Sequence, residues 1–134
     1  MRFARFMEPP TRQHKNLKAM QKIVHRPWGR FTVIGSWPSK ITVKILTIDP
    51  HSRLSLQKHR LRDEEWLCVG GVAEVQVDER TFRLKAGEKA FIPRRHLHRV
   101  GSDVGAEILE VAYGTFKEDD IIRTEDDYGR ARTK

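Results

Sequence analysis

The chain has 134 residues and a mass of 15.7 kDa, with 38% hydrophobic and 33% charged residues, which fits one domain with a single core. No apolar run approaches the ~20 residues of a membrane helix, and the first residues lack the apolar stretch of a signal peptide. The single cysteine, Cys68, excludes an internal disulfide. Together these features predict a soluble cytoplasmic protein.

The net charge of +8 is concentrated near the N-terminus. Residues 1–30 contain eight basic residues and one acid, a balance of +7, and residues 31–134 contribute the remaining +1. We therefore predict a basic arm over residues 1–22 and a folded domain over residues 23–134. A solvated extension is the favoured interpretation of the arm, with an acidic partner or, less favoured, nucleic acid as alternatives. Another interpretation takes Met20 as the natural first residue.

In chain order, the local signals are mainly those of short strands. Residues 15–24 fit two or three turns of helix. Strand signals follow, as β-branched runs and apolar–polar alternation, at residues 30–34, 41–48, 54–59, 65–69, 72–77, 81–84, 89–92 and 107–113. The charged residues 118–129 predict a short C-terminal helix. Because no helical pattern alternates with the strands, we predict an all-β sandwich or barrel rather than a parallel α/β sheet.

The segment Gln-Lys-His-Arg-Leu-Arg-Asp-Glu, residues 57–64, carries the chemical signal. Gln57 and His59 are two apart, so on a strand they share one face. Glu64 follows a short turn and can return to the same site, and His98 lies far downstream. Two imidazoles, a carboxylate and an amide oxygen form a plausible set of ligands for a divalent metal. Taken alone, each of these residues more often has a structural role than a metal-binding one, so the prediction of a metal site depends on their spacing.

That spacing resembles the paired motifs of the cupin superfamily. Gln57, His59, Glu64 and Gly71 fall at the intervals of the first motif, and Gly87, Pro93 and His98 at those of the second. Several family positions are replaced. They are His51 for the leading Gly, Gln57 for the first His, Arg95 for the Gly after the Pro, and Ser102 for the terminal Asn.

Longer matches resemble the C-terminal cupin domain of type II phosphomannose isomerases. They run from about residue 24 to residue 130 and comprise residues 26–29, 54–59, 62–66, 91–93, 98–99, 118–123 and 127–130. In that family the domain often follows a mannose-1-phosphate guanylyltransferase domain, which these residues do not match. The resemblance therefore implies a stand-alone cupin similar to mannose-6-phosphate isomerase. Two positions depart from the pattern: Ile45, where a basic residue commonly follows Lys44, and Glu65, where His is usual.

The resemblance implies a cupin double-stranded β-helix, a jelly-roll barrel, that interconverts mannose 6-phosphate and fructose 6-phosphate through an enediol. One divalent metal is expected, with zinc favoured and cobalt, manganese, nickel or magnesium as alternatives. Its implied ligands are Gln57, His59, Glu64 and His98. For the substrate phosphate we expect Arg62 and Arg99, with Arg95 as a further candidate. Lys44 and His96 are the candidate acid/base groups, with Glu64 as an alternative base.

Other functions remain as hypotheses. The departures at Ile45 and Glu65 favour a cupin that binds a sugar phosphate or sugar nucleotide without converting it. An accessory subunit could instead dock on a separate guanylyltransferase through the basic arm. An iron oxygenase is a fourth hypothesis, disfavoured because Gln57 replaces a ligand that is usually His. We also expect a homodimer, formed by strand exchange near the N-terminus.

Overall fold

The computed structural model describes residues 22–131. The predicted arm up to residue 21, and the helical turns predicted over residues 15–21, lie outside these described residues. The last three residues of that predicted helix, 22–24, belong instead to strand β1 (Lys22–Arg26). They form a strand because they pair with β2 (Gly29–Trp37) in an antiparallel hairpin that closes at residues 26–29.

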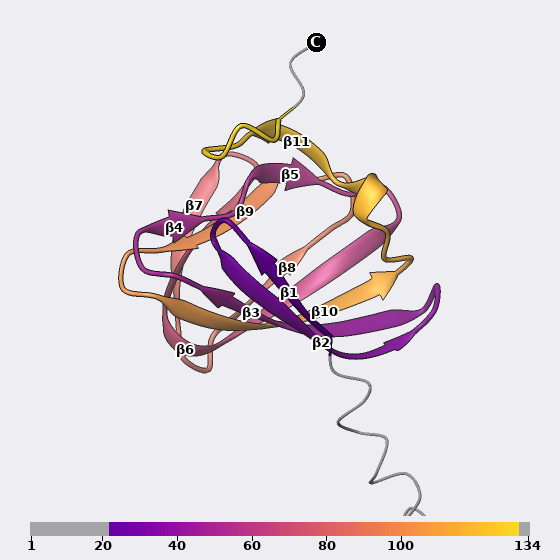
Figure 1. Cartoon of the computed structure of the whole chain (residues 1–134), viewed down its shortest axis with the longest axis horizontal. Coiled ribbons are helices and arrows are strands. Elements are labelled where there is room, and N and C mark those ends of the chain that lie inside the picture. The colour runs from indigo at the N-terminus through magenta and orange to yellow at the C-terminus, as the bar shows by residue number, and fades with distance from the viewer. Residues whose placement is uncertain (1–21, 132–134) are drawn as a thin grey trace, which may run out of the picture.

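The described residues form an all-β fold, as predicted (Figure 1). After β1 and β2 the strands are β3 (Ile41–Ile48), β4 (Ser52–Arg53), β5 (Leu56–Lys58), β6 (Arg62–Val77), β7 (Arg80–Lys85), β8 (Lys89–Ile92), β9 (His98–Ser102), β10 (Ala106–Gly114) and β11 (Ile122–Glu125). The 3₁₀ turn η2 (Glu118–Asp120) precedes β11. In the described part of the chain, no helix has the length and apolar character needed to cross a bilayer.

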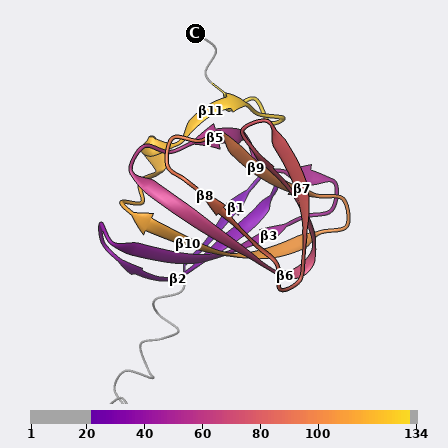
Figure 2. The same ribbon diagram turned by 180° about the vertical axis from the view of Figure 1, so that it is seen from behind.

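The strands form one continuous sheet that curls into a barrel with two layers. Its order is β1-β2-β3-β10-β6-β9-β5-β11. The larger layer contains β1, β2, β3, β10, the first half of β6, and β8. The smaller layer contains the second half of β6 with β7, β9, β4, β5 and β11. Figure 2 shows the long β6 from behind, where it crosses the molecule and joins the two layers.

β6 can serve both layers because it bends at Gly70 and Gly71. Gly71 has φ 67°, a left-handed conformation that favours glycine. A Cβ at this position would also collide with the carbonyl oxygen of Gly105. The two strands predicted on either side of this pair are therefore one strand of 16 residues with a bend.

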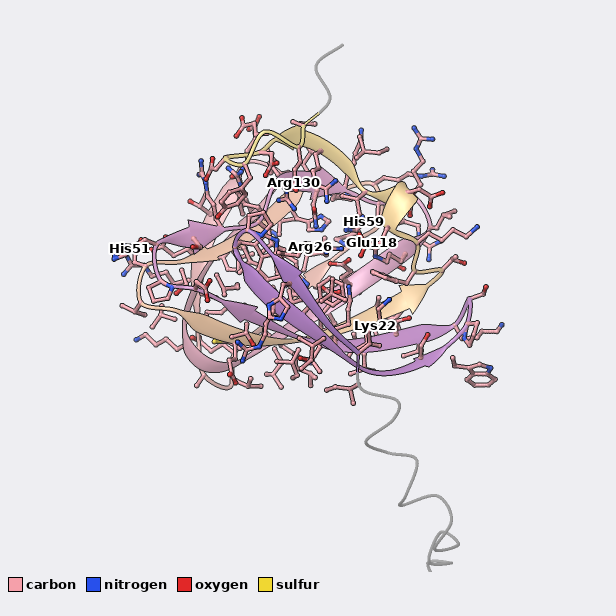
Figure 3. All side chains as sticks on the ribbon, viewed as in Figure 1. Lys22, Arg26, His51, His59, Glu118 and Arg130 are labelled. Carbon is pink, nitrogen blue, oxygen red and sulfur yellow. The ribbon has the colours of Figure 1, made fainter. Side chains whose placement is uncertain are left out.

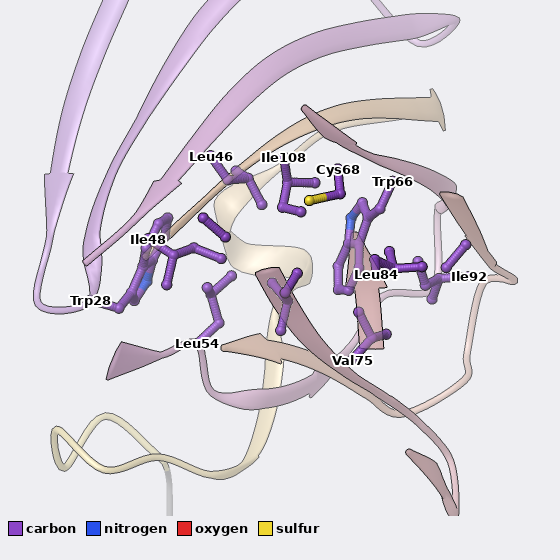
Figure 4. Packing of buried hydrophobic residues seen from close by; sticks show 14 of the residues in the cluster. Trp28, Leu46, Ile48, Leu54, Trp66, Cys68, Val75, Leu84, Ile92 and Ile108 are labelled. Carbon is purple, nitrogen blue, oxygen red and sulfur yellow. The ribbon is translucent and has the colours of Figure 1, made fainter. Parts of the chain in front are cut away.

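The inward side chains divide the barrel interior into an apolar end and a polar end. Leu46, Ile108 and Cys68 are paired across β3, β10 and β6 and lie in the apolar core, which also includes Trp28, Ile48 and Val75 (Figure 4). Two residues along the same strands, the inward row is Lys44, Glu110 and Trp66. The strands thus carry core residues at one end and chemically active side chains at the other.

The C-terminal segment differs from the predicted helix over residues 118–129. Only η2 is helical, and β11 pairs with β5 in antiparallel fashion. The free edge of β5 supplies backbone partners that local sequence does not reveal. The Asp120 carboxylate fixes this segment, because it accepts the backbone N–H groups of Arg60 and Leu61 at 3.0–3.2 Å.

Candidate metal centre

Three of the predicted metal ligands meet at the polar end of the barrel. His59 follows β5, Glu64 lies in β6, and His98 begins β9. One potential ligand atom from each lies within 4.8 Å of the other two. The Nε2 atoms of His59 and His98 lie 3.1 and 3.6 Å from the Glu64 carboxylate oxygens, and all three side chains are buried. This cluster could hold a metal ion.

Both imidazoles are oriented through their other ring nitrogen. Nδ1 of His98 lies 2.9 Å from the carbonyl oxygen of His96, and Nδ1 of His59 lies 3.4 Å from that of Asp120. A proton on each Nδ1 can be donated to these carbonyls, which leaves the Nε2 lone pairs facing Glu64. Nε2 of His98 is buried and has no hydrogen-bond partner among the described residues.

The protonation states also suit metal binding. Burial lowers the pKa of His98 to about 4, which keeps its imidazole neutral at neutral pH. Burial alone would raise the pKa of Glu64, but its close contact with His59 and the guanidinium of Arg62 hold that pKa well below the usual value. A neutral imidazole and an ionised carboxylate are the forms that bind metal. These protonation states, together with the unpartnered Nε2 of His98, indicate that the donor set fits a divalent ion.

Gln57, the fourth predicted ligand, faces the same interior. It pairs with His98 across β5 and β9, it is buried, and it lines the cavity beside Glu64. Its side-chain oxygen accepts a hydrogen bond from the Ser55 hydroxyl at 2.8 Å. A lone pair remains on that oxygen, because an amide oxygen accepts two hydrogen bonds.

Arg62 lies inside the cluster rather than at the barrel surface. Its Nε donates to Glu64 at 2.9 Å, and one of its terminal nitrogens lies 3.1 Å from Nε2 of His59. Its guanidinium also stacks over the Phe116 ring at 4.6 Å. The side chain is only 2% exposed. Arg62 therefore neutralises Glu64 and contacts two candidate metal ligands.

Lys44, a predicted acid/base residue, forms a second charged group beside the cluster. Its Nζ lies 3.2 Å from Oε1 of Glu110, and both side chains are buried. Oε1 of Glu110 has no hydrogen-bond partner in the described structure, whereas Oε2 accepts from the Trp66 indole at 3.1 Å. The same indole N–H lies 3.2 Å from Glu64, so Trp66 links the two carboxylates. Burial and the charge of Glu64 raise the pKa of Glu110.

A cavity of about 40 Å³ joins these groups to the surface. Its lining contains a set of cations drawn from distant parts of the chain: Arg26, Lys44, Arg62, Arg123 and Arg130. Its carboxylates are Glu64, Glu110 and Glu118. Figure 3 labels Arg26, Glu118 and Arg130 together with His59. The cavity therefore brings a cationic lining next to the candidate metal ligands.

The structure does not bring His96 or Arg95 into this cavity. Both lie in the loop before β9, so the two-residue spacing of His96 and His98 does not place them on one strand face. His96 is half exposed and lies 2.6 Å from the Asp78 carboxylate. Arg95 is exposed and has φ 71°, which explains why the motif usually has glycine there. Its backbone N–H donates to the carbonyl of His59 at 2.6 Å.

Arg99 points away from the cavity as well. Neighbouring residues on a strand face opposite sides, so Arg99 faces outward where His98 faces inward. Its Nε donates to the carbonyl oxygen of Leu54 at 3.2 Å, and Nη1 lies 3.4 Å from Glu125. It lines a separate hollow of about 690 Å³ on the outside of the smaller layer. Most charges in that hollow are paired, as in Arg53 with Asp127 and Arg83 with Glu74.

Sequence reasoning missed five residues of the cavity as site residues: Arg26, Glu110, Phe116, Arg123 and Arg130. Signals for most of them were available. The three arginines fall within segments that resemble the isomerase family, and Glu110 is a lone acid on the inward parity of an apolar strand. For Phe116 there was no signal, because an aromatic residue after a strand is usually core.

Comparison with known proteins identifies the family. The family described as mannose-6-phosphate isomerase C-terminal matches residues 13–126. The alginate biosynthesis protein AlgA of Pseudomonas aeruginosa is 41% identical over 110 residues, covering 80% of this chain and 23% of that protein. The mannose-1-phosphate guanylyltransferase of Escherichia coli is 36% identical over 110 residues, with the same two shares. The chain thus spans about a quarter of the length of these relatives.

Solved structures agree on the fold. KdgF from Halomonas sp. superposes with a TM-score of 0.64 at 16% identity, covering 74% of this chain and 88% of that one. An RmlC-like cupin from Shewanella frigidimarina gives a TM-score of 0.66 at 22% identity, covering 75% and 89%. With residues 13–126 matched by the family model, the chain belongs to the mannose-6-phosphate isomerase C-terminal family and has a cupin fold.

Proposed function

We propose that this protein is a metal-dependent isomerase that interconverts mannose 6-phosphate and fructose 6-phosphate. The observation that carries the proposal is the single cavity lined by Glu64, by the Lys44–Glu110 pair and by arginines from both ends of the domain. An aldose–ketose isomerase needs an electrophile at two sugar oxygens, an acid/base near C1 and C2, and cations for the phosphate. The family match supports the same substrate class.

The phosphate would lie among Arg26, Arg123 and Arg130, which line the cavity; because the cavity has a volume of only about 40 Å³, these side chains would have to move apart to admit the sugar. Arg123 is short of anionic partners: its buried Nε has no hydrogen-bond partner in the described structure, and burial together with Arg130 lowers its pKa. Arg26 lies 3.2 Å from Glu118, and the Arg130 guanidinium forms two hydrogen bonds with Asp126. A phosphate can therefore use Arg123 directly and the other two through their remaining N–H groups. These three arginines would bind the phosphate in place of Arg95 and Arg99, which the sequence had suggested.

His59, Glu64 and His98, with Gln57 as a fourth ligand, would hold the metal. When bound, a divalent ion acts as a Lewis acid on the two sugar oxygens that exchange between hydroxyl and carbonyl. Zinc is the favoured ion because two of the ligands are imidazoles. Arg62 would give up its contact with His59 and keep Glu64 oriented.

The proton transfer would fall to Glu110 and Lys44. In the forward direction, Glu110 would take the proton from C2 of open-chain mannose 6-phosphate and return it to C1, while the proton of the C2 hydroxyl passes to the C1 carbonyl oxygen. The result is fructose 6-phosphate with no net change in protons. Oε1 of Glu110 is free of hydrogen bonds among the described residues, and the Lys44 ammonium at 3.2 Å stabilises the ionised form. The apolar faces of Phe31 and Phe116 keep Lys44 in place.

A second candidate function is a sugar-phosphate binding protein without catalysis. The contacts of Arg62 favour it, because the guanidinium already engages His59 and Glu64, the atoms a metal would need. Such a protein would bind the sugar phosphate saturably and leave it unchanged.

The deciding experiment uses protein stripped with a chelator and then supplied with zinc, cobalt, manganese, nickel or magnesium separately. We expect mannose 6-phosphate to be converted only when a metal is present, with one ion bound per chain. His59→Ala should lose both bound metal and turnover. His96→Ala is the matched control, because His96 is an exposed histidine outside the cavity, and it should retain both.

Two outcomes would contradict the proposal in different ways. Full metal occupancy in His59→Ala would reject the ligand assignment. One metal per chain and saturable sugar-phosphate binding without turnover would reject the isomerase and establish the binding protein. Oxygen consumption with iron would indicate oxygenase chemistry instead.

A further inference from the structure

Among the described residues, the lining of the cavity contains three ion pairs that differ in their exposure to solvent. Two of them are almost fully buried, with side chains no more than 6% exposed: Arg62–Glu64 and Lys44–Glu110. The third joins Nη2 of Arg26 to Oε1 of Glu118 at 3.2 Å, and these two side chains are 29% and 48% exposed. The Arg26–Glu118 pair therefore lies where the cavity meets solvent.

This pair connects two segments that are distant in the sequence. Arg26 ends β1, and Glu118 begins the turn η2 (Figure 3). In the described part of the chain, it is the only side-chain hydrogen bond between the β1–β2 hairpin and η2. The cavity has a volume of only about 40 Å³, so a sugar phosphate can enter only if lining side chains move. The exposed pair is the one that can open with the least loss of packing.

Opening this pair requires side-chain rotation only, because the backbone of both segments is held in place. Arg26 pairs with Gly29 in the hairpin, and the Asp120 carboxylate anchors η2 by accepting backbone N–H groups of the loop after β5. The Arg26 guanidinium lies 5.3 Å from the centroid of the Phe31 ring, a cation–π contact that keeps it over the cavity when Glu118 turns away. Because partly exposed ion pairs contribute little to stability, an anion that binds Arg26 better can replace the carboxylate.

Glu118 also acts on the neighbouring arginines. Burial and the charge of Arg130 lower the pKa of Arg123, and nearby carboxylates, Glu118 among them, oppose that shift. The Glu118 carboxylate therefore lies close enough to stabilise the positive charges of this group in the empty cavity. A bound phosphate would have the same electrostatic role in the loaded cavity.

The proposed reaction gives a reason for such a replaceable contact. Isomerisation changes C1 and C2 of the sugar and leaves the phosphate at C6 unchanged, so the arginines bind substrate and product alike. Binding that is equally tight before and after the reaction slows product release and does not favour the transition state. A carboxylate that competes for one of the arginines lowers this affinity and promotes release.

We infer that Glu118 is a built-in competitor of the substrate phosphate, which holds Arg26 in the empty cavity and binds it again as the product leaves. This role rests on the phosphate site proposed above and adds the residue that sets its affinity. Glu118 holds Arg26 through one hydrogen bond, whereas a phosphate can accept two parallel ones from a guanidinium and carries more charge. The phosphate therefore displaces the carboxylate, which turns to water because the two anions repel each other.

The test measures the affinity for inorganic phosphate by isothermal titration calorimetry. The metal-loaded full chain is titrated first and the chelated chain second, which separates phosphate on the arginines from phosphate on the metal. Glu118→Gln keeps the size of the side chain and removes its charge, so the affinity for phosphate should rise about three- to tenfold. Asp119→Asn is the matched control, because Asp119 is exposed in the same turn and forms no ion pair in the described structure. It should change the affinity by less than about twofold.

A second comparison uses Arg26→Ala, which removes the contact from the other side. In that background Glu118→Gln should change the phosphate affinity by less than about twofold, because the competitor has lost the group for which it competes. A gain as large as in the wild-type background would reduce Glu118 to a general effect of charge and overturn its role as a competitor. Unchanged or weaker phosphate binding in Glu118→Gln alone would overturn that role as well.

Turnover separates the role of Glu118 from the proposed isomerase. In the conversion of mannose 6-phosphate, Glu118→Gln should lower KM and should not raise kcat. The expected phosphate affinities without turnover in wild type would reject the isomerase and leave the competitor in place. No phosphate binding by wild type or by any variant would reject the proposed phosphate site and the competitor with it.

Discussion

Glu64 is the residue on which the candidate metal centre depends. Its two carboxylate oxygens contact His59, Arg62 and Trp66 at 2.9–3.2 Å, and His98 lies at 3.6 Å. A buried carboxylate is costly without such partners. The partners keep Glu64 ionised, and Glu64 in turn aligns both imidazoles. The charge state of the whole site therefore follows from one side chain and its four neighbours.

Replacing Glu110 by glutamine tests the proposed proton transfer. Glu110→Gln keeps an oxygen that can accept from Trp66 but removes the base, so turnover of mannose 6-phosphate should fall by about 10²–10⁴-fold. Metal content should not change, because Glu110 is not a ligand. Glu107→Gln, an exposed position on the same strand, should behave as wild type. Unchanged turnover in Glu110→Gln would remove the Lys44–Glu110 pair from the mechanism.

The buried imidazole of His98 predicts how stability depends on pH. Burial lowers its pKa from 6.5 to about 4, so between these values the unfolded chain binds a proton that the folded chain does not. The free energy of unfolding of the metal-free protein should therefore decrease as pH falls through this window, by a few kcal/mol at most. The lowered pKa of Glu64 adds a further loss at lower pH.

Urea unfolding of chelator-treated protein at several pH values measures this effect. In His98→Gln the decrease between pH 6.5 and pH 4 should be clearly smaller than in wild type. Parallel curves for the two proteins would show that His98 has the same pKa in the folded and unfolded states, and would contradict the prediction.

Among the structural elements, β6 has the largest role in assembling the fold. It pairs with β7, β8, β9 and β10, and it supplies Glu64 and Trp66 to the polar end and Cys68 to the core. The bend at Gly71 lets one strand do this in both layers. The geometry of the metal centre thus depends on a backbone conformation seven residues from Glu64.

A methyl group at Gly71 should lower the free energy of unfolding far more than one at Gly87. Gly71→Ala combines the left-handed backbone with a collision against the Gly105 carbonyl, and should lower the free energy of unfolding by about 3 kcal/mol or more. Gly87 also has a positive φ, of 91°, but has open space around it, so Gly87→Ala should cost only about 1 kcal/mol. Urea unfolding measures both. Equal losses would mean that backbone strain alone explains the effect at Gly71.

Strands with strong local signals were predictable, and strands defined by distant partners were not. Residues 41–48 and 89–92 were predicted with the observed bounds, because the first is a run rich in β-branched residues that ends at Asp49 and Pro50, and the second ends at Pro93. β9 was missed, since His-Arg-Val-Gly-Ser has little strand character. β11 was predicted as helix because Ile-Arg-Thr-Glu is polar and its pairing with β5 depends on tertiary contact.

At the scale of the whole molecule, the cavity joins the first and last strands of the described domain. Arg26 comes from β1, while Arg123 and Arg130 come from β11 and the residues after it. The metal cluster could be predicted because motif spacing fixes which residues share a strand face. The cationic rim could not, because it depends on how the C-terminal segment folds back over β5.

This long-range assembly predicts which arginine recognises the phosphate. Arg123→Ala should raise the KM for mannose 6-phosphate by about 10–100-fold, since a charge-assisted hydrogen bond contributes about 1.5–3 kcal/mol. Arg99→Ala, a buried arginine on the opposite side of its strand, is the control and should leave KM unchanged. A larger effect of Arg99→Ala than of Arg123→Ala would move phosphate recognition to the outer hollow.

The contacts of Arg62 have a consequence for the maturation of the protein. Its guanidinium balances the Glu64 carboxylate at 2.9 Å without any ion. We therefore expect the barrel to fold without the metal, so that chelator-treated protein keeps the far-ultraviolet circular dichroism of the loaded protein. Preparing the apo-protein and loading it with a chosen metal would then be separate steps.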